Sequence, residues 1–321
     1  MPIWERTDAL KEERESVRVA LAKARADQDL YQRLTGPIRR LINCLRWVGS
    51  VVSRQRRRSA GLVPISISVL TPVYRPVPEH LAQCLTSVAR QTGLKSRNVA
   101  IQHVVVDDGS NDPGVDGVLE ANHAAWRLIR RRAANGGIVA ASNDALSLAT
   151  GEWVVMLDHD DVLAVDALVT VAEAARAAPN AVVVYSDHDI IRADGRYVSP
   201  FFKPDLPPER LRHTNYITHL VAVRRDRLIE TGGFRPGTDG AQDHDILLRM
   251  LELGLPFVHV PRILLHWRQS PASVASDPTN KPEAFGRVWA ESGRHLDCGA
   301  LALRERMLSC PSRSLTSSVR W

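Results

Sequence analysis

Three carboxylates stand within four residues directly after a short apolar run. Residues 153–157 are continuously apolar, which is typical of a strand buried on both faces. Asp158, Asp160 and Asp161 follow, and carboxylates about 6 Å apart repel by roughly 2–3 kcal/mol per pair at an effective dielectric of about 20. A divalent cation would remove this cost, and Mg²⁺ and Mn²⁺ prefer oxygen ligands. The alternative is an acidic turn in which Asp161 caps the helix that follows.

Two further predicted strands also run into acidic residues. Residues 99–106 lead into Asp107-Asp108, and residues 181–185 lead into Asp187 and Asp189. One acidic turn is common after a strand. In open parallel sheets, however, ligands bind beyond the carboxyl ends of the strands. Three acidic strand ends on one edge therefore predict an acidic, metal-dependent cleft.

Strands alternate with helices along the chain, which predicts an α/β fold with a mostly parallel sheet and right-handed crossovers. The expected strands are residues 65–70, 99–106, 127–131, 153–157, 181–185, 215–223, 256–260 and 263–266. The expected helices are residues 5–34, which could instead form a short coiled segment, and residues 79–91, 115–123, 135–148, 163–177, 225–231, 243–253 and 282–296. Residues 200–208 form a proline-rich loop.

The composition is that of a globular protein in a reducing compartment. No run of about 20 apolar residues predicts a transmembrane helix, and the charged N-terminus does not resemble a secretory signal. Cys44, Cys84, Cys298 and Cys310 are far apart and are expected to be thiols. We expect a cytoplasmic protein with a helical, basic extension at 1–60, one domain at 64–300 and a disordered tail at 301–321.

The positive charge is concentrated near the N-terminus. No acid occurs between Asp29 and Glu79, and residues 38–53 predict an amphipathic helix with arginines on its polar face. Residues 38–58 would suit an anionic membrane surface on the inner face of the membrane. Alternatively, the helix packs on the domain and its arginines are solvated. Nucleic acid is not expected, because no helix-turn-helix, zinc-finger or RNP signature is present.

Seven motifs occur in an order that resembles the family 2 glycosyltransferases, which have the GT-A fold. They are residues 68–74, 84–92, 106–110, 135–143, 151–161, 232–245 and 266–268. The resemblance implies a Rossmann-like central sheet flanked by helices, after an N-terminal helical extension. Within the family, the chain looks most like bacterial enzymes that build surface polysaccharide, such as rhamnosyltransferases.

The resemblance implies how a nucleotide-sugar donor is held. Pro72, Tyr74 and Asp108 would hold the base and ribose, with Asp108 accepting from the base. Asp158 would also contact the nucleotide, and Arg268 would pair with phosphate oxygens. The simpler readings are a core aromatic for Tyr74, a turn residue for Asp108 and a solvated side chain for Arg268.

The same resemblance implies a metal site for Mg²⁺ or Mn²⁺. Asp158 and Asp160 match the D-x-D motif, whose second Asp binds the cation on the donor diphosphate. His266 matches a late histidine of the family and would be a further ligand. The simpler reading of His266 is a hydrogen-bonded histidine at the end of a strand.

Asp243 matches the catalytic Asp of the family's E-D motif, with Gln242 where Glu is more usual. It would deprotonate the acceptor hydroxyl as that group displaces the nucleoside diphosphate with inversion. Asp187, Asp189, Gln242 and Asp245 would border the sugar or acceptor pocket, although helix capping alone would explain Asp243 and Asp245.

The expected donor is a UDP- or dTDP-sugar and the expected acceptor a glycan or lipid-linked glycan. The Q-x-x-R-W motif of processive synthases is missing, which favours addition of one or a few sugars. The alternative is a degenerate, non-catalytic protein that binds nucleotide or glycan in the same cleft.

Overall fold

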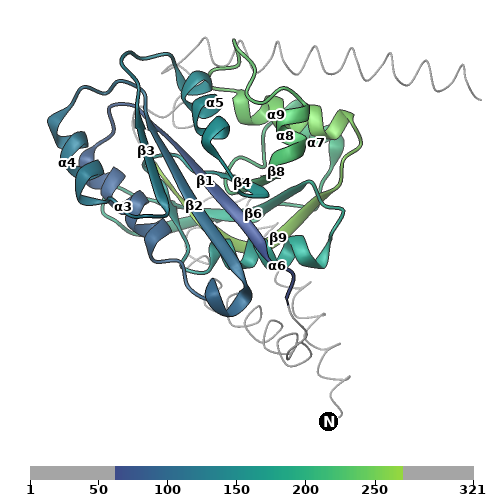
Figure 1. The fold of residues 1–321 in the computed structure, drawn as a ribbon. Helices are drawn as coiled ribbons and strands as arrows, with labels where there is room; N and C mark the ends of the chain where they lie inside the picture. The colour runs from purple at the N-terminus through teal and green to yellow at the C-terminus, as the bar shows by residue number, and fades with distance from the viewer. Residues whose placement is uncertain (1–61, 270–321) are drawn as a thin grey trace, which may run out of the picture.

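A computed structural model describes residues 62–269, which fold around one nine-stranded sheet (Figure 1). The strand order is β3-β2-β1-β4-β8-β6-β9-β5, and β7 pairs with β6. The strands are β1 (Ile65–Val73), β2 (Val99–Asp107), β3 (Arg127–Arg131), β4 (Trp153–Met156), β5 (Val162–Leu163), β6 (Val183–Ile191), β7 (Tyr197–Phe201), β8 (Val221–Arg224) and β9 (Phe257–Arg268). The helices are α3 (Pro78–Ala89), the 3₁₀ turn η1 (Lys95–Arg97), α4 (Pro113–Ala121), α5 (Ile138–Leu148), α6 (Ala167–Ala177), α7 (Pro208–His213), α8 (Arg225–Glu230) and α9 (Gln242–Glu252).

The strands β1 to β4 are parallel, so their carboxyl ends lie at the same edge of the sheet. β1 pairs in parallel with β2 and β4, and β2 pairs in parallel with β3. Val73 at the end of β1 lies opposite Asp107 at the end of β2. The expected α/β architecture is therefore confirmed, with the acidic turns after β2 and β4 on the same edge.

Gly151 is required where the chain enters β4. A Cβ atom at this position would lie 2.5 Å from the backbone nitrogen of Ser68 on β1. The Gly151 amide instead donates to Ser68 Oγ at 2.8 Å. The glycine thus allows β4 to approach β1 closely and fixes the register that carries the acidic turn to its place.

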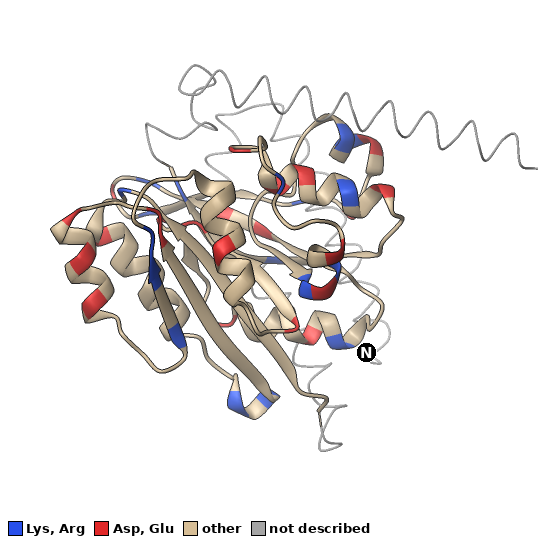
Figure 2. Ribbon diagram, turned by 45° about the horizontal axis from the view of Figure 1, so that its top comes forward, with Lys and Arg blue, Asp and Glu red and all other residues tan. Residues whose placement is uncertain are grey.

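The second half of the sheet is mixed. β8 runs antiparallel to both β4 and β6, whereas β6 and β9 are parallel. β5 and β7 add antiparallel pairings to β9 and β6. β3 is the edge strand at the other end of the strand order, and its Arg130 and Arg131 are exposed. Figure 2 shows how Lys and Arg (blue) and Asp and Glu (red) are distributed over the sheet and its helices.

Helices cover both faces of the sheet. Apolar residues of α5, α7, α8 and α9 form one core with the sheet, and these helices lie together in Figure 1. Residues of α3 and α6 form a second core on the other face, and α4 packs beside α3. Each fully buried Leu, Ile or Val side chain contributes about 1.5–3 kcal/mol, so the two cores hold the acidic edge in place.

Several expected bounds differ from the structure, and the two strands expected at residues 256–260 and 263–266 form one strand, β9. β6 continues through Asp187 and Asp189 to Ile191 rather than ending at residue 185, because β7 and β9 pair with it on both sides. The helix expected from residue 163 begins at Ala167, because residues 162–163 pair with β9 as β5. β8 begins at Val221, and the residues before it are irregular.

β7 ends at Phe201, inside the expected proline-rich loop, and α7 begins at the last residue of that loop, Pro208. The helices expected at residues 5–34, 38–53 and 282–296, the basic segment 38–58 and the tail 301–321 lie outside the described residues. Within residues 62–269, no helix combines the length and apolar character needed to cross a membrane.

Candidate active site

The acidic turn after β4 contains a buried carboxylate that is only half satisfied. Asp161 is fully buried, and its Oδ1 accepts from the Arg268 backbone amide at 2.8 Å. Its Oδ2 is buried and accepts no hydrogen bond from the described residues. Burial raises the pKa of Asp161 well above its usual range, and the charges of Asp158 and Asp160 raise it further. Burying and clustering these carboxylates costs free energy, and a bound cation would lower that cost.

His219, in the irregular stretch before β8, completes this cluster. One ligand atom each from Asp158, Asp161 and His219 lies within 4.8 Å of the others, and His219 Nδ1 is 3.9 Å from Asp161 Oδ2. Opposite ligands of a Mg²⁺ or Mn²⁺ ion are about 4.2 Å apart, so small shifts would bring all three into coordination distance. Two carboxylates and an imidazole are suitable donors for such an ion, and Asp161 Oδ2 would gain the partner it lacks. The residues present fit a divalent cation.

Only part of the predicted ligand set enters this cluster. Asp158 belongs to it, whereas Asp161 was expected to cap a helix and His219 was not singled out. His266 instead pairs through Nδ1 with Asp189 Oδ1. Asp160 lies near enough for its charge to raise the pKa of Asp158, an effect that adds to burial. The roles of Asp160 and His266 as metal ligands stay predictions.

Arg268 fastens the acidic turn to the end of β9. It is buried, and its Nε donates to the Asp160 carbonyl oxygen at 2.8 Å. Its Nη2 donates to Gln83 Oε1 on α3 at 2.6 Å. The guanidinium is thus engaged with protein atoms, and its predicted contact with phosphate remains untested.

Asp243 lies in the first turn of α9 and is held from two sides. Its Oδ1 accepts from the His244 amide at 2.8 Å, and its Oδ2 accepts from Asn215 Nδ2 at 2.7 Å. Asp243 is only partly buried, and its charge acts on Asp158, so the two carboxylates share one electrostatic environment. Gln242 Oε1 accepts from the Gly240 amide at 2.8 Å and closes the loop before the helix.

Asp245 anchors α9 to the chain that precedes it. It is fully buried, and it pairs with Arg249, one turn later, and with Arg235. Arg249 also donates to the carbonyl oxygens of Thr231 and Gly233. Asp245, predicted to border a sugar pocket, is therefore part of a buried ion-pair network.

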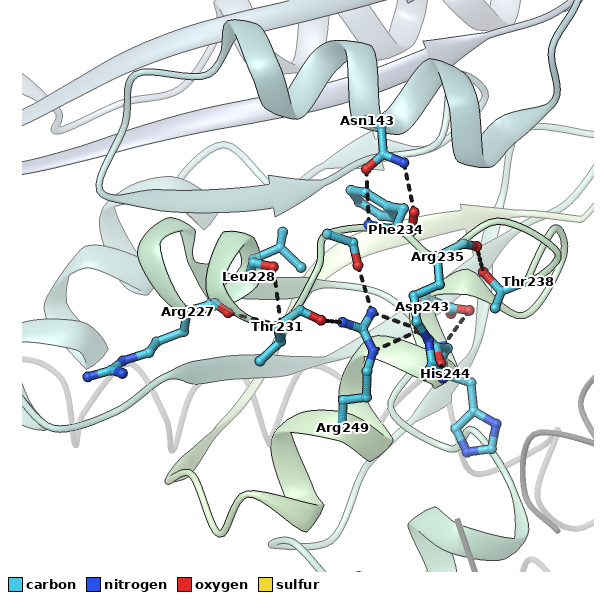
Figure 3. A network of polar contacts seen from close by, with 12 residues as sticks. Asn143, Arg227, Leu228, Thr231, Phe234, Arg235, Thr238, Asp243, His244 and Arg249 are labelled. Carbon is cyan, nitrogen blue, oxygen red and sulfur yellow. Dashed lines mark hydrogen bonds and ion pairs between the residues drawn. The ribbon is translucent and has the colours of Figure 1, made fainter. Parts of the chain in front are cut away.

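Asn143 of α5, which belongs to the motif at residues 135–143, forms two hydrogen bonds with the turn before α9. Its side chain accepts from the Phe234 amide at 3.0 Å and donates to the Phe234 carbonyl oxygen at 2.7 Å (Figure 3). Gly233, at φ 63°, passes so close that an added Cβ would lie 2.9 Å from Asn143 Oδ1. The turn before α9 is thereby clamped to α5.

Asp108 organises the loop that leads into α5. Its two carboxylate oxygens accept from the amides of Gly136 and Gly137 and from the side chains of Asn135 and Arg132. An ionised carboxylate has about four acceptor sites, so a nucleotide base would have to replace one of these donors. The predicted contact between Asp108 and the base stays a prediction.

Tyr74 and Pro72 lie at the end of β1, on the same edge as Asp108. The Tyr74 side chain is exposed, with the Arg75 guanidinium 5.3 Å from its ring centre, so it is not a core aromatic. Pro72 lies opposite Val106 in the register of β1 and β2. Their predicted contact with the nucleotide stays a prediction.

Asp187 and Asp189 are fully buried within β6 and do not follow it as a turn. Asp187 Oδ1 accepts from the Lys203 amide at 2.9 Å and pairs with His259 Nε2 at 2.9 Å. Lys203 Nζ donates to the carbonyl oxygen of His219, so Asp187 is linked to His219 through Lys203. The predicted place of Asp187 and Asp189 in a sugar pocket stays a prediction.

The family model for glycosyl transferase family 2 matches residues 68–234. The chain belongs to glycosyl transferase family 2. The match contains the acidic turn and His219, and it ends before Asp243.

A curated relative and two solved structures agree with this family membership. The O-antigen biosynthesis protein RfbC of Myxococcus xanthus is 36% identical over 214 residues, which are 65% of this chain and 16% of that protein. TarS of S. aureus (residues 1–349), solved with UDP-GlcNAc, has a TM-score of 0.55 and 21% identity, covering 71% of this chain and 66% of that one. The mannosyltransferase PcManGT of Pyrobaculum calidifontis, solved with GDP-Man and Mn²⁺, has a TM-score of 0.54 and 20% identity, covering 75% and 69%.

These likenesses confirm the GT-A fold of this family 2 chain. The match covers only 16% of the length of RfbC.

Proposed function

We propose that the chain is an inverting, metal-dependent glycosyltransferase that moves a sugar from a nucleoside diphosphate to a hydroxyl group of a glycan or lipid-linked acceptor. The observation that carries this proposal is the cluster of Asp158, Asp161 and His219, in which a buried oxygen lacks a partner, together with the charge of Asp243 acting on it. A donor diphosphate and its cation bring the charges that this cluster would balance.

The donor is proposed to be a UDP- or dTDP-sugar. The structures of the TarS protein with UDP-GlcNAc and of PcManGT with GDP-Man and Mn²⁺ support a nucleotide-sugar donor and a divalent cation on this fold. The similarity to an O-antigen biosynthesis protein supports a role in surface polysaccharide synthesis.

The proposed chemistry assigns one task to each half of the site. Asp158, Asp161 and His219 would hold Mg²⁺ or Mn²⁺, which when bound neutralises charge on the leaving diphosphate. Asp243 accepts the proton of the acceptor hydroxyl as the oxygen attacks the anomeric carbon from the face opposite the diphosphate. Asn215 and the His244 amide each occupy one acceptor site of the Asp243 carboxylate and leave others for this proton.

Donor hydrolysis tests the proposed function. UDP-glucose, UDP-GlcNAc and dTDP-rhamnose are incubated with the full chain and Mn²⁺, and release of the nucleoside diphosphate is measured. At least one donor should be hydrolysed, and Asp243→Asn should lower this turnover by about 10²-fold or more while UDP affinity by calorimetry stays within about twofold. Binding of UDP without turnover of any donor would favour the non-catalytic alternative.

Metal affinity tests the ligand set separately from activity. Mn²⁺ binding is followed by electron paramagnetic resonance in Asp161→Asn, His219→Ala and Asp160→Asn variants. Loss of about 10-fold or more in affinity is expected for Asp161→Asn and His219→Ala, as for removal of a ligand. A loss confined to Asp160→Asn would restore the ligand set implied by the D-x-D motif.

We also propose that residues 64–300 form the catalytic domain, between an extension at 1–60 and a tail at 301–321. We further propose that residues 38–58 attach the protein to an anionic membrane surface at the inner face of the membrane. The acid-free interval between Asp29 and Glu79 supports this attachment. Flotation with anionic vesicles should recover the full chain. Equal recovery after deletion of residues 1–60 would contradict it.

A further inference from the structure

The five residues from Asn215 to His219 connect the two halves of the site. At one end, Asn215 Nδ2 donates to Asp243 Oδ2 at 2.7 Å. At the other end, the His219 imidazole faces Asp161, with Nδ1 3.9 Å from Oδ2. One short segment therefore touches both the proposed base and the proposed metal site.

This segment is held in one conformation. Asn215 Oδ1 accepts from the Thr218 amide at 3.1 Å, which closes a turn. Tyr216 and Ile217, inside that turn, are buried in the core that also contains α9. The carbonyl oxygen of His219 is fastened by Lys203 Nζ and lies 3.2 Å from a ring nitrogen of His188. Both ends of the segment are thus fixed by groups outside it.

The turn also decides which way the Asn215 amide points. Because Oδ1 accepts from Thr218, the Nδ2 group is the one directed at Asp243, and it can only donate. The His244 amide donates to the other oxygen of Asp243. With one fixed donor on each oxygen, the plane of the carboxylate is set, and so is the direction of its remaining lone pairs.

We propose that Asn215 is a positioning residue for sugar transfer: it orients the Asp243 carboxylate and, through the turn to His219, holds it in register with the cation site. This rests on the proposed function of Asp243 as the base. Hydrogen bonds to charged groups are among the stronger ones in proteins, so loss of this bond leaves the base free to rotate away from the acceptor.

The test is a double-mutant cycle on turnover with Mn²⁺ and whichever of UDP-glucose, UDP-GlcNAc or dTDP-rhamnose the full chain hydrolyses. Asn215→Ala should lower kcat by about 10-fold or more, with the donor KM and Mn²⁺ affinity within about twofold. In an Asp243→Asn background, Asn215→Ala should cause no further loss, because the group through which it acts is already gone. Asn180→Ala, on an exposed loop before β6, is the matched control.

Each outcome separates this inference from the proposed function. A kcat within twofold of wild type for Asn215→Ala, or a full further loss in the Asp243→Asn background, overturns the positioning role. Wild-type activity of Asp243→Asn, or no turnover of any donor by the wild-type chain, overturns the proposed function and this inference with it. Urea unfolding of every variant shows whether a loss of kcat reflects unfolding. If Asn215→Ala does not fold, Asn215→Ser takes its place in the cycle with the same expected results, because its shorter, uncharged side chain offers the Thr218 amide an acceptor and is too short to keep the bond to Asp243.

Discussion

Replacement of Arg249 by Met should destabilise the domain far more than replacement of its neighbour Arg235. Arg249 shares the buried carboxylate of Asp245 with Arg235, but its own side chain is only 9% exposed, against 41% for Arg235. Removal of one partner from a buried ion pair costs about 3–5 kcal/mol, because a charge is left uncompensated. The carbonyl oxygens of Thr231 and Gly233 would also lose a donor. We therefore expect a loss of about 3–5 kcal/mol for Arg249→Met.

Urea unfolding followed by fluorescence would measure this loss. Arg235→Met serves as the matched control and should cost less than about 1 kcal/mol, because pairs that reach solvent contribute little. A double variant, Asp245→Leu with Arg249→Met, should recover at least half of the loss, since no buried charge then remains without a partner. A loss in Arg249→Met no larger than that in Arg235→Met would refute the assignment of this network as the anchor of α9.

Two further predictions concern the rest of the sheet. Gly151→Ala should destabilise the domain by about 2 kcal/mol or more, because the new Cβ would lie 2.5 Å from the Ser68 nitrogen. Gly117→Ala in α4 is the control: its Cβ meets no neighbour, so it should stabilise the domain by about 0.5–1 kcal/mol. Thermal unfolding of both variants measures these changes, and equal effects would contradict the prediction. His103 is fully buried, and burial together with Arg127 holds its pKa well below 6.5, so below that pH the unfolded chain binds a proton that the folded chain does not. Stability should therefore fall as the pH is lowered from 7.5 to 5.5, with a slope on account of this residue of at most about 1.4 kcal/mol per pH unit, the limit for one proton. That part of the pH dependence should be absent in His103→Gln and retained in His123→Gln, and an unchanged pH dependence in His103→Gln would contradict the assignment.

The parallel half of the fold could be predicted because its signals are local. β1, β2 and β4 are continuous apolar runs that end in turn-forming or acidic residues, and the structure keeps their strands within a few residues of the expected bounds. β6 was expected to end before Asp187 because polar residues follow. It continues because Asp187 and Asp189 find partners in Lys203, His259 and His266, which lie far away in the sequence.

The site shows the same division between local and distant information. The spacing of Asp158 and Asp160 carries a recognisable motif, and so does the acidic start of α9 at Asp243. His219 carries none, because its place beside Asp161 arises from the pairing that brings β8 beside β4. Asn215 could not have been singled out either, since its bond to Asp243 spans 28 residues.

The exposed arginines of the edge strand β3 affect how two copies of this protein can associate. Among residues 62–269, β3 is paired with β2 alone, so its other side offers backbone donors and acceptors to any strand that approaches. Arg130 and Arg131 are exposed on β3, and Arg131 pairs with Asp116 of α4. Two β3 strands placed side by side would bring the Arg130 charges of the two copies together, and this repulsion opposes edge-to-edge pairing between copies.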